Sequence, residues 1–367
     1  MVGDWPGLTA SRGRSTFLPS GKKMLETDDN ARLEPIPAGW YCVGFTDELA
    51  RGEVKTQLLG GRERVVFRTR GGRAAVVDAF CPHLGAHLGH GGTVVGETLR
   101  CPFHGFCFDV EGACTQTGYG TRPPPKARLG ALAVIERLGA VFVHLDPHGR
   151  DPAWEIPDID QTGWTPIRHR RIRLRSHPQE VAENSVDVGH FAHVHGYEEV
   201  RETRALTTSG PLLRVGYGMR RRRPRALVFR DLAIEFDIHQ YGLGCAFVEA
   251  RTSVGLLSRQ LVLVTPLGAG EVDLRIGCSV RRAEPGARSR LLGFFPAAWL
   301  AELAFRAFEK DVEQDLDIWN HKRFVHPPAL AEGDGPIGTY RKWARQFYPA
   351  RPGGEARALR VAGGGER

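Results

Sequence analysis

Two short cysteine–histidine pairs constrain this chain more than any other part of its sequence. The first pair is Cys81-Pro-His83, the second is Cys101-Pro-Phe-His104, and seventeen residues separate them. Two thiolates and two imidazoles can occupy four positions around a metal centre. Tetrahedral zinc accepts such a set. A [2Fe–2S] cluster also accepts it, with two cysteines on one iron and two histidines on the other.

The order of the four residues separates these alternatives. A zinc finger keeps its cysteine pair apart from its histidine pair, whereas each half of this motif carries one of each. The order Cys-x-His followed by Cys-x-x-His is the signature of a Rieske [2Fe–2S] cluster, with Cys81, His83, Cys101 and His104 as ligands. Neighbouring cysteines and histidines complete no second pair, and we expect them to be packing or surface residues: His87, His90, Cys107 and Cys114.

Composition indicates an ordinary globular protein of a reducing compartment. At 367 residues the chain is long enough for two domains with separate cores. Its content of 41% hydrophobic and 25% charged residues is ordinary for a globular protein. The seven cysteines are scattered, and the first forty residues contain no apolar leader, so we expect a cytoplasmic protein. We also expect no membrane span, because charged residues and a proline interrupt the most apolar late segment, residues 291–308.

The net charge of +8 raises the question of nucleic-acid binding. The sharpest cationic run, Arg220–Arg225, lacks interleaved aromatic residues and is not joined by a nucleic-acid fold signature. We therefore expect no nucleic-acid partner and interpret the run as a solvated strand end or loop. A docking surface for an acidic electron-donor protein is the alternative, because complementary charge accelerates encounter.

The pattern along the chain predicts an α+β protein with two domains. Short β-type runs separated by glycine and charged turns predict a small antiparallel β domain at residues 35–148. A stretch rich in proline and glycine, residues 149–164, is typical of a linker. Residues 165–348 predict an antiparallel sheet followed by a long helix from Pro296 to about His321. We expect a flexible tail at residues 1–34 and a disordered one at residues 349–367.

A histidine-rich segment in the second domain predicts a second metal site. Asp187, His190, His193 and His195 fall within nine residues that resemble a short helix ended by Gly196. His190 and His193 share one face of an ideal helix. His190 and His195 lie about 140° apart, so that pair requires the helix to unwind. Spacing alone leaves both histidine pairs open as metal ligands.

A carboxylate on the long helix could complete this site. Asp311 and Asp315 fall on the apolar stripe of the helix, where a carboxylate is unfavourable unless it meets a cation or a metal. Two histidines and one carboxylate are the ligand set of non-haem Fe(II) oxygenases. Asp315 is the best candidate for the carboxylate, and a salt bridge to an arginine is its alternative role.

With both sites in view, the chain resembles the α subunits of Rieske non-haem iron oxygenases. The similarity is greatest to bacterial 3-ketosteroid 9α-hydroxylase oxygenases and animal cholesterol 7-desaturases. It rests on four segments: residues 81–89, 101–106, 183–191 and 315–322. Phe106 departs from the pattern, since many relatives have tryptophan there.

The resemblance implies a role for each site residue. His190, His195 and Asp315 would bind a mononuclear Fe(II), and His193 would be a bystander. Asp187 would be the catalytic bridging residue, which links a cluster histidine of one subunit to an iron ligand of the next. The resemblance also implies a head-to-tail homotrimer and a helix-grip catalytic domain, in which an antiparallel sheet wraps a long C-terminal helix.

The implied activity is a monooxygenase that uses O₂ to hydroxylate a C–H bond of a bulky apolar substrate, such as a steroid or terpenoid. Electrons from NAD(P)H would arrive through a separate flavin reductase or a ferredoxin, because the chain has no glycine-rich dinucleotide fingerprint. Desaturation, demethylation or oxidative cyclisation of a specialised metabolite is the alternative reaction. A Rieske electron-transfer protein is the alternative of another class.

Overall fold

The computed structural model describes residue 33 and residues 36–222, 231–268, 270–282 and 295–348. The two tails expected at residues 1–34 and 349–367 lie outside the described residues, apart from Leu33. From Leu33 onward the chain forms one unit by its internal contacts.

The first part of the described chain is built from small antiparallel sheets. One has the order β1-β11-β10, a second has the order β2-β3-β4-β9, and a third has the order β5-β6-β7-β8. The strands are β1 (Gly39–Phe45), β2 (Val54–Leu59), β3 (Arg62–Arg68), β4 (Ala74–Asp78), β5 (Thr93–Val95), β6 (Thr98–Arg100), β7 (Cys107–Phe108), β8 (Cys114–Gln116), β9 (Ala131–Leu132), β10 (Val134–Arg137) and β11 (Ala140–Leu145). A short 3₁₀ turn, η1 (Thr46–Glu48), follows β1.

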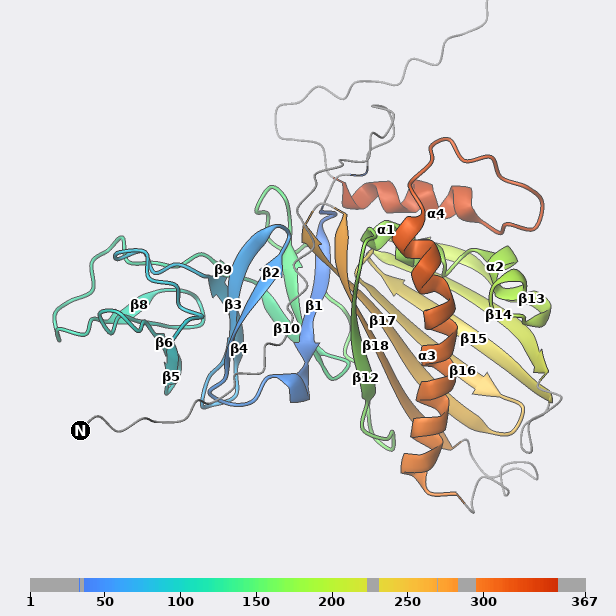
Figure 1. The fold of residues 1–367 in the computed structure, drawn as a ribbon, viewed down its shortest axis with the longest axis horizontal. Helices are drawn as coiled ribbons and strands as arrows, with labels where there is room; N and C mark the ends of the chain where they lie inside the picture. Colours follow the sequence, from blue (N-terminus) through green and yellow to red (C-terminus); the bar gives the residue numbers. More distant parts are fainter. Residues whose placement is uncertain (1–32, 34–35, 223–230, 269, 283–294, 349–367) are drawn as a thin grey trace, which may run out of the picture. The chain divides into compact units, whose positions relative to one another are not determined.

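The second part is dominated by one seven-stranded antiparallel sheet with the order β12-β18-β17-β16-β15-β14-β13 (Figure 1). Its strands are β12 (Arg168–Leu174), β13 (Glu198–Ser209), β14 (Leu212–Arg222), β15 (Asp231–Tyr241), β16 (Cys245–Thr252), β17 (Leu256–Gly268) and β18 (Glu271–Arg282). The helices are α1 (Pro178–Glu183), α2 (Val188–His193), α3 (Ala297–His321) and α4 (Ile337–Ala344), followed by the 3₁₀ turn η3 (Arg345–Phe347). Residues 146–167, between β11 and β12, contain no helix or strand.

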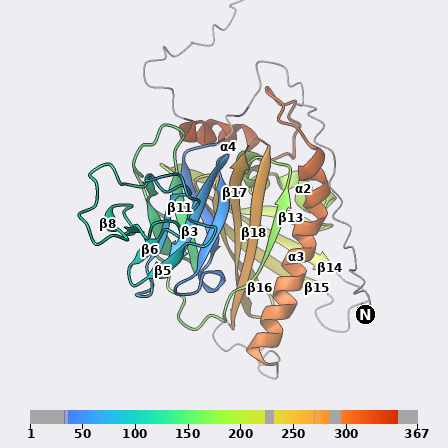
Figure 2. The ribbon, with the colours of Figure 1, turned by 60° about the vertical axis from the view of Figure 1, so that its left-hand side comes forward.

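Helix α3 lies along the large sheet and contacts β18 and β12 (Figure 2). The stripe predicted from the sequence faces the sheet, because Leu300, Phe308, Val312 and Trp319 are buried. Phe305 is also buried there. The long helix and the antiparallel sheet are therefore confirmed, and α3 is held by apolar packing, which is how most protein helices are stabilised.

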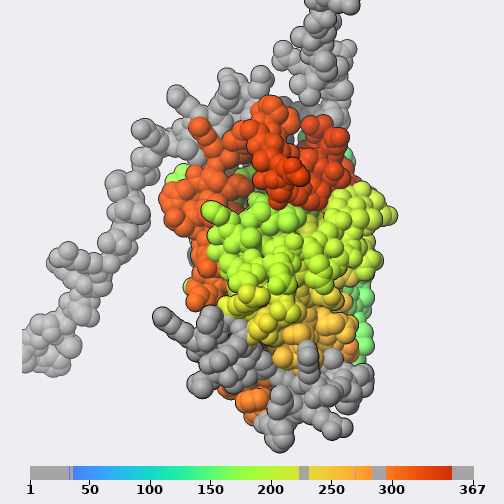
Figure 3. All heavy atoms as spheres, turned by 90° about the vertical axis from the view of Figure 1, so that its right-hand side faces the viewer, coloured from blue at the N-terminus to red at the C-terminus, as the bar shows by residue number. Residues whose placement is uncertain are grey.

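Helix α4, which the sequence analysis did not predict, packs against α1. The Tyr340 hydroxyl donates to the Gln179 carbonyl at 2.7 Å, and the Arg341 guanidinium pairs with Glu183 at 2.6 Å. The red α4 and the green α1–α2 segment consequently lie close together on the face seen in Figure 3. These contacts hold α1 against α4.

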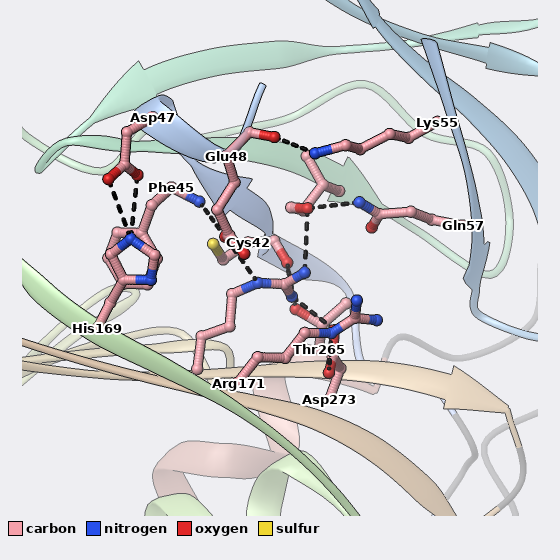
Figure 4. Close-up of polar contacts among 12 residues, drawn as sticks. Cys42, Phe45, Asp47, Glu48, Lys55, Gln57, His169, Arg171, Thr265 and Asp273 are labelled. Atoms are coloured by element: carbon pink, nitrogen blue, oxygen red, sulfur yellow. Dashed lines mark hydrogen bonds and ion pairs between the residues drawn. The ribbon is translucent and has the colours of Figure 1, made fainter. Parts of the chain in front are cut away.

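A buried polar network joins β1 to the large sheet (Figure 4). The Arg275 guanidinium is 2% exposed, and it donates to the carbonyls of Cys42 and Val43 at 3.3 and 3.2 Å. Asp273 lies between Arg275 and Arg171 and accepts from them at 2.6 and 2.7 Å. Buried charges require this degree of pairing, because an unpaired one carries its full desolvation cost.

Candidate active site

The two cysteine–histidine pairs lie on two loops of matching geometry. In the first loop the Gly85 N–H donates to the Cys81 carbonyl at 2.9 Å, and in the second the Gly105 N–H donates to the Cys101 carbonyl at 3.2 Å. Gly85 and Gly105 have φ angles of 76° and 67°, a backbone region that residues with a Cβ rarely adopt. The repeated turn places the two cysteines and the two glycines in equivalent positions, and each loop carries its histidine between them.

The four candidate cluster ligands are brought together by this arrangement. The His83 and His104 rings lie 4.7 Å apart, and Cys81 and Cys101 are both 3% exposed, with their side chains in hydrogen-bond contact. Burial raises the pKa of Cys81 to about 11, so a metal centre is needed to hold it as a thiolate. The donor set fits a cluster with cysteines on one iron and histidines on the other.

Large apolar side chains surround these loops at the surface. Leu84 follows His83 and is 65% exposed, and Phe103 precedes His104 and is 62% exposed. Cys107 and Cys114 were expected to be packing or surface residues; Cys107 is buried and Cys114 is half-buried. An exposed apolar patch beside a cofactor is typical of an interaction surface.

The second candidate site forms where α2 ends opposite α3. The His190 Nε2 and His195 Nε2 atoms lie 3.1 Å apart, and His195 Nε2 lies 3.6 Å from Asp315 Oδ2. One ligand atom from each of these three residues falls within 4.8 Å of the others. Helix α2 ends at His193, so the unwinding that the His190–His195 pair requires occurs before His195. His193 is exposed and is not part of the group.

Hydrogen bonds outside the site fix the tautomers of both imidazoles. His190 Nδ1 lies 2.6 Å from the Asp187 carbonyl oxygen, and His195 Nδ1 lies 3.1 Å from Gln314 Oε1. Both oxygens can only accept, so each Nδ1 directs a proton outward and each Nε2 points into the site. Burial also lowers the pKa of His190, which keeps that ring neutral. The two Nε2 atoms face each other at 3.1 Å, the orientation in which both imidazoles could bind one metal ion.

The spacing of these atoms fits a divalent metal. Ligand atoms about 2.1 Å from a metal and at right angles to each other are separated by about 3 Å. The observed separations of 3.1 and 3.6 Å are close to this value. Two histidines and one carboxylate on one side of a metal leave positions open for O₂, as in non-haem Fe(II) oxygenases.

Asp315 is buried and hydrogen bonded to a neighbouring amide. Its side chain is 8% exposed, and the Asn184 side chain hydrogen bonds to it. The Trp319 indole N–H donates to Asn184 Oδ1 at 3.4 Å, so the Asn184 amide is oriented in turn. Burial raises the pKa of Asp315 to about 6, although the nearby His195 lowers it. A metal at this position would offset the cost of burying the carboxylate.

The three residues line a cavity of about 140 Å³ between α3 and the sheet. We call it the iron-site cavity. Its walls are mainly apolar and include Phe191, Phe236, Ile238, Val262 and Phe308. Alternation along β15 explains the sheet side of this wall, because residues 236, 238 and 240 project from the same face of the strand.

A second cavity of about 390 Å³ adjoins the first along α3. It is lined mainly by apolar side chains, including Leu232, Ile234, Leu256, Trp299 and Leu303. We call it the outer cavity. Both cavities share a set of wall residues, which we call the neck: Tyr197, Phe236, Gln260, Phe308 and Asp311.

Sequence reasoning missed the second layer of the site. Asn184 lies in the recognised motif, but nothing in the sequence indicates its contact with Asp315. Gln314 is adjacent to Asp315, and a polar residue one position from a ligand is no specific signal. The expectation for the Arg220–Arg225 run was wrong at Arg221, whose side chain is 13% exposed and lines the outer cavity. Arg220 and Arg222 are more exposed, as expected, and residues 223–225 lie outside the described chain.

Family models match both parts of the chain. Residues 39–126 match the Rieske [2Fe–2S] domain, and residues 143–348 match the 3-ketosteroid 9α-hydroxylase C-terminal domain. The second match alone covers more than half of the chain. No helix among the described residues is long and apolar enough to cross a membrane.

Several characterised proteins are similar to the chain. Cholesterol 7-desaturase from Bombyx mori is 33% identical over 337 residues, which cover 86% of this chain and 70% of that protein. The oxygenase component of a 3-ketosteroid 9α-monooxygenase from Rhodococcus rhodochrous is 28% identical over 349 residues, which cover 88% and 86%. The crystal structure of dicamba monooxygenase bound to dicamba has a TM-score of 0.65 at 18% identity and covers 84% of this chain and 96% of its own. This last likeness supports the fold.

Proposed function

The chain belongs to the Rieske non-haem iron oxygenases that carry the 3-ketosteroid 9α-hydroxylase C-terminal domain, and from this premise we propose that it hydroxylates a C–H bond of a bulky, mostly apolar polycycle. The observation that carries the proposal is the convergence of His190, His195 and Asp315 on an apolar cavity. The proposed substrate class is steroid-like or terpenoid-like, in keeping with the names of the relatives.

The sizes of the two cavities support a substrate with several rings. A cavity of about 150 Å³ accommodates one benzene ring, so the iron-site cavity of about 140 Å³ holds little more than the reacting part of a polycycle. The outer cavity of about 390 Å³ offers space for the remainder. Apolar walls with few polar groups are typical of sites that bind such ligands.

The residues of the chain divide the work of the reaction. His190, His195 and Asp315 would hold the iron, and the Asp187 carbonyl and Gln314 would orient the two imidazoles through their Nδ1 protons. Bound iron and cluster supply the redox chemistry, in which one oxygen atom of O₂ enters a C–H bond and the other leaves as water with two electrons and two protons. The apolar walls of the iron-site cavity exclude water from the reacting carbon.

The cluster residues and the exposed apolar patch support electron transfer between subunits. We assign Cys81, His83, Cys101 and His104 to the cluster, and Asp187 to the bridge toward the cluster of a neighbouring copy in a head-to-tail homotrimer. Leu84 and Phe103 would be covered in that contact. Coexpression tests this arrangement. A Cys101→Ser chain and an Asp315→Ala chain should each be inactive alone, and mixed oligomers should recover activity. Mixed oligomers without activity would contradict transfer between subunits.

The electrons would come from NAD(P)H through a flavin reductase, directly or through a ferredoxin. We place the protein in the cytoplasm, because all seven cysteines are free and cytosolic proteins rarely carry disulfides. The assigned domain limits are residues 35–148 for the Rieske domain, 149–164 for the linker and 165–348 for the catalytic domain.

Iron counting tests the site. The purified protein should hold about three irons per chain, two in the cluster and one in the mononuclear site. His190→Ala should lose the mononuclear iron and keep the visible absorption of the cluster. His193→Ala is the matched control, because His193 is exposed and three residues away, and it should keep all the iron. Equal iron loss in both variants would contradict the ligand assignment.

A substrate panel under ¹⁸O₂ tests the reaction. The protein, supplied with a surrogate ferredoxin and reductase, would be given steroids, terpenoids and aromatic acids. Labelled hydroxyl groups confined to the polycycles support the proposal. Label confined to aromatic acids would refute the substrate class. A dehydrogenated, unlabelled polycycle would assign the desaturase reaction, which the similarity to cholesterol 7-desaturase favours as the second candidate.

A further inference from the structure

A charged cluster interrupts the mainly apolar wall between the two cavities. Asp311 lies one helical turn before Asp315 on α3 and lines both the iron-site cavity and the outer cavity. Arg221, from β14, lines the outer cavity. Tyr197, which follows α2, lines both. Three separate segments of the chain therefore place two charges and a phenol where the two cavities adjoin.

The cluster is held together by direct contacts. The Tyr197 hydroxyl donates to Asp311 Oδ2 at 3.0 Å, and Arg221 Nη2 donates to Asp311 Oδ1. The Arg221 guanidinium also lies 4.4 Å from the centre of the Tyr197 ring, within the range of a cation–π contact. The Arg221 and Asp311 side chains are 13% and 17% exposed, so bulk water screens their charges weakly.

The charge balance of the cluster determines which substrates it tolerates. Arg221 alone would attract a carboxylate in the outer cavity, because a guanidinium and a carboxylate pair well. Asp311 already occupies that guanidinium and cancels its charge. A second carboxylate at the neck would meet the negative charge of Asp311 and would have to compete with it for Arg221. A neutral polycycle meets no such opposition.

We propose that the Arg221–Asp311–Tyr197 cluster determines substrate specificity by admitting neutral polycycles and rejecting those that carry a carboxylate. The proposal rests on the proposed function, because it concerns the same substrate site. It adds a preference for neutral over anionic substrates, here called the charge rule, which the family assignment does not contain. Asp311 acts here by repulsion, which is one of the two ways in which a protein discriminates between ligands.

The test compares two ligands that differ only in charge. A steroid with a side-chain carboxylic acid and the methyl ester of the same acid share one ring skeleton. Equilibrium dissociation constants at pH 7.5 would be measured for the wild-type protein and for Asp311→Asn, together with the iron content. Asparagine keeps the shape of the side chain and can still accept from Tyr197, but it leaves the charge of Arg221 unbalanced.

Asp311→Asn should raise the affinity for the acid relative to the ester by about tenfold or more, since unfavourable charge pairs at an interface are costly. Arg221→Leu should lower the relative affinity for the acid, because the charge of Asp311 then stands alone. Asp231→Asn is the matched control: it removes the carboxylate of an exposed pair with Arg220 at 2.9 Å, outside both cavities. It should leave the ratio unchanged.

The possible failures can be told apart. An unchanged ratio in Asp311→Asn, with normal iron content, would overturn the charge rule and leave the proposed function intact. Equal weakening of both ligands would overturn it as well, because that result indicates a structural link between α3 and β14. If the wild-type protein bound neither the acid nor the ester and oxidised no neutral polycycle, the proposed function itself would fail.

Discussion

Replacing Asp315 with asparagine should stabilise the iron-free protein at neutral pH while abolishing its mononuclear iron. Burial raises the pKa of Asp315 from its ordinary value of 3.8 to about 6 in the folded protein. The folded state therefore holds this proton more tightly than the unfolded state does. In the iron-free protein the ionised carboxylate carries an uncompensated desolvation cost, which a bound metal would offset.

The sign and size of the effect follow from the two pKa values. Well below pH 3.8, the pKa of the unfolded state, the carboxyl is protonated in both states, and Asp315 carries no ionisation penalty. As the pH rises through 6, the unfolded state ionises first and the folded state loses stability. Above that range the loss is about 3 kcal/mol, corresponding to a shift of about two units. About half of this loss is present at pH 5 and nearly all of it at pH 7.5.

The assay is urea unfolding of wild-type and Asp315→Asn proteins at pH 5 and pH 7.5, after a chelator has removed the mononuclear iron but not the cluster. Tryptophan fluorescence is a suitable signal, because Trp319 lies beside the site. The stability of the variant relative to wild type should increase by between 1 and 2 kcal/mol, about half the full effect, from pH 5 to pH 7.5. Any pH-independent effect of the substitution cancels in this comparison.

Added Fe(II) provides the control. Iron should stabilise the wild-type protein, because a ligand that binds only the folded state raises its stability, and it should not stabilise the variant. A stability difference that does not change with pH would refute the reasoning. A variant that becomes relatively less stable as the pH rises would refute it more directly, since Asp315 would then be stabilised in its ionised form.

Two further substitutions follow from the contacts described above. Asp187→Asn should keep both metal centres, because asparagine also caps helices well and the backbone carbonyl of residue 187 remains available to His190. Turnover should fall sharply. Loss of iron from this variant would instead show that Asp187 has a structural role. Asp273→Asn should destabilise the protein by about 3–5 kcal/mol in a denaturation assay, because it leaves buried Arg275 underpaired. Glu97→Gln, in an exposed pair with Arg73, should cost much less, and equal costs would contradict the argument.

The cluster motif and the fold class could be predicted from the sequence because the signals are local. Each cluster loop contains its own cysteine, histidine and turn glycine, so its geometry depends on a few consecutive residues. The stripe of α3 and the strand patterns are likewise short periodicities set by the geometry of a helix or a strand. Such features do not depend on which distant element lies opposite.

The choice between His193 and His195 is of another kind. Spacing left both open, and the resemblance indicated His195. In the structure α2 ends at His193, which leaves His195 free to turn toward His190 and Asp315. The helix end itself is local, because the Tyr197 N–H donates to the Phe191 carbonyl at 3.0 Å across Gly196, whose φ is 68°. Only the tertiary structure places Asp315 of α3 opposite His195.

The sequence by itself determined the candidate ligand types and the two domain patterns, and the tertiary structure alone decided which charges line the cavities. Arg220, Arg221 and Arg222 look equivalent in a cationic run. On β14, however, Arg221 continues the buried row of Tyr217 and Met219, so it turns inward while its neighbours pair with surface carboxylates. Its partner Asp311 lies ninety residues away on α3. Periodicity indicates which side chains share a face, but only the packing of distant elements determines what that face meets.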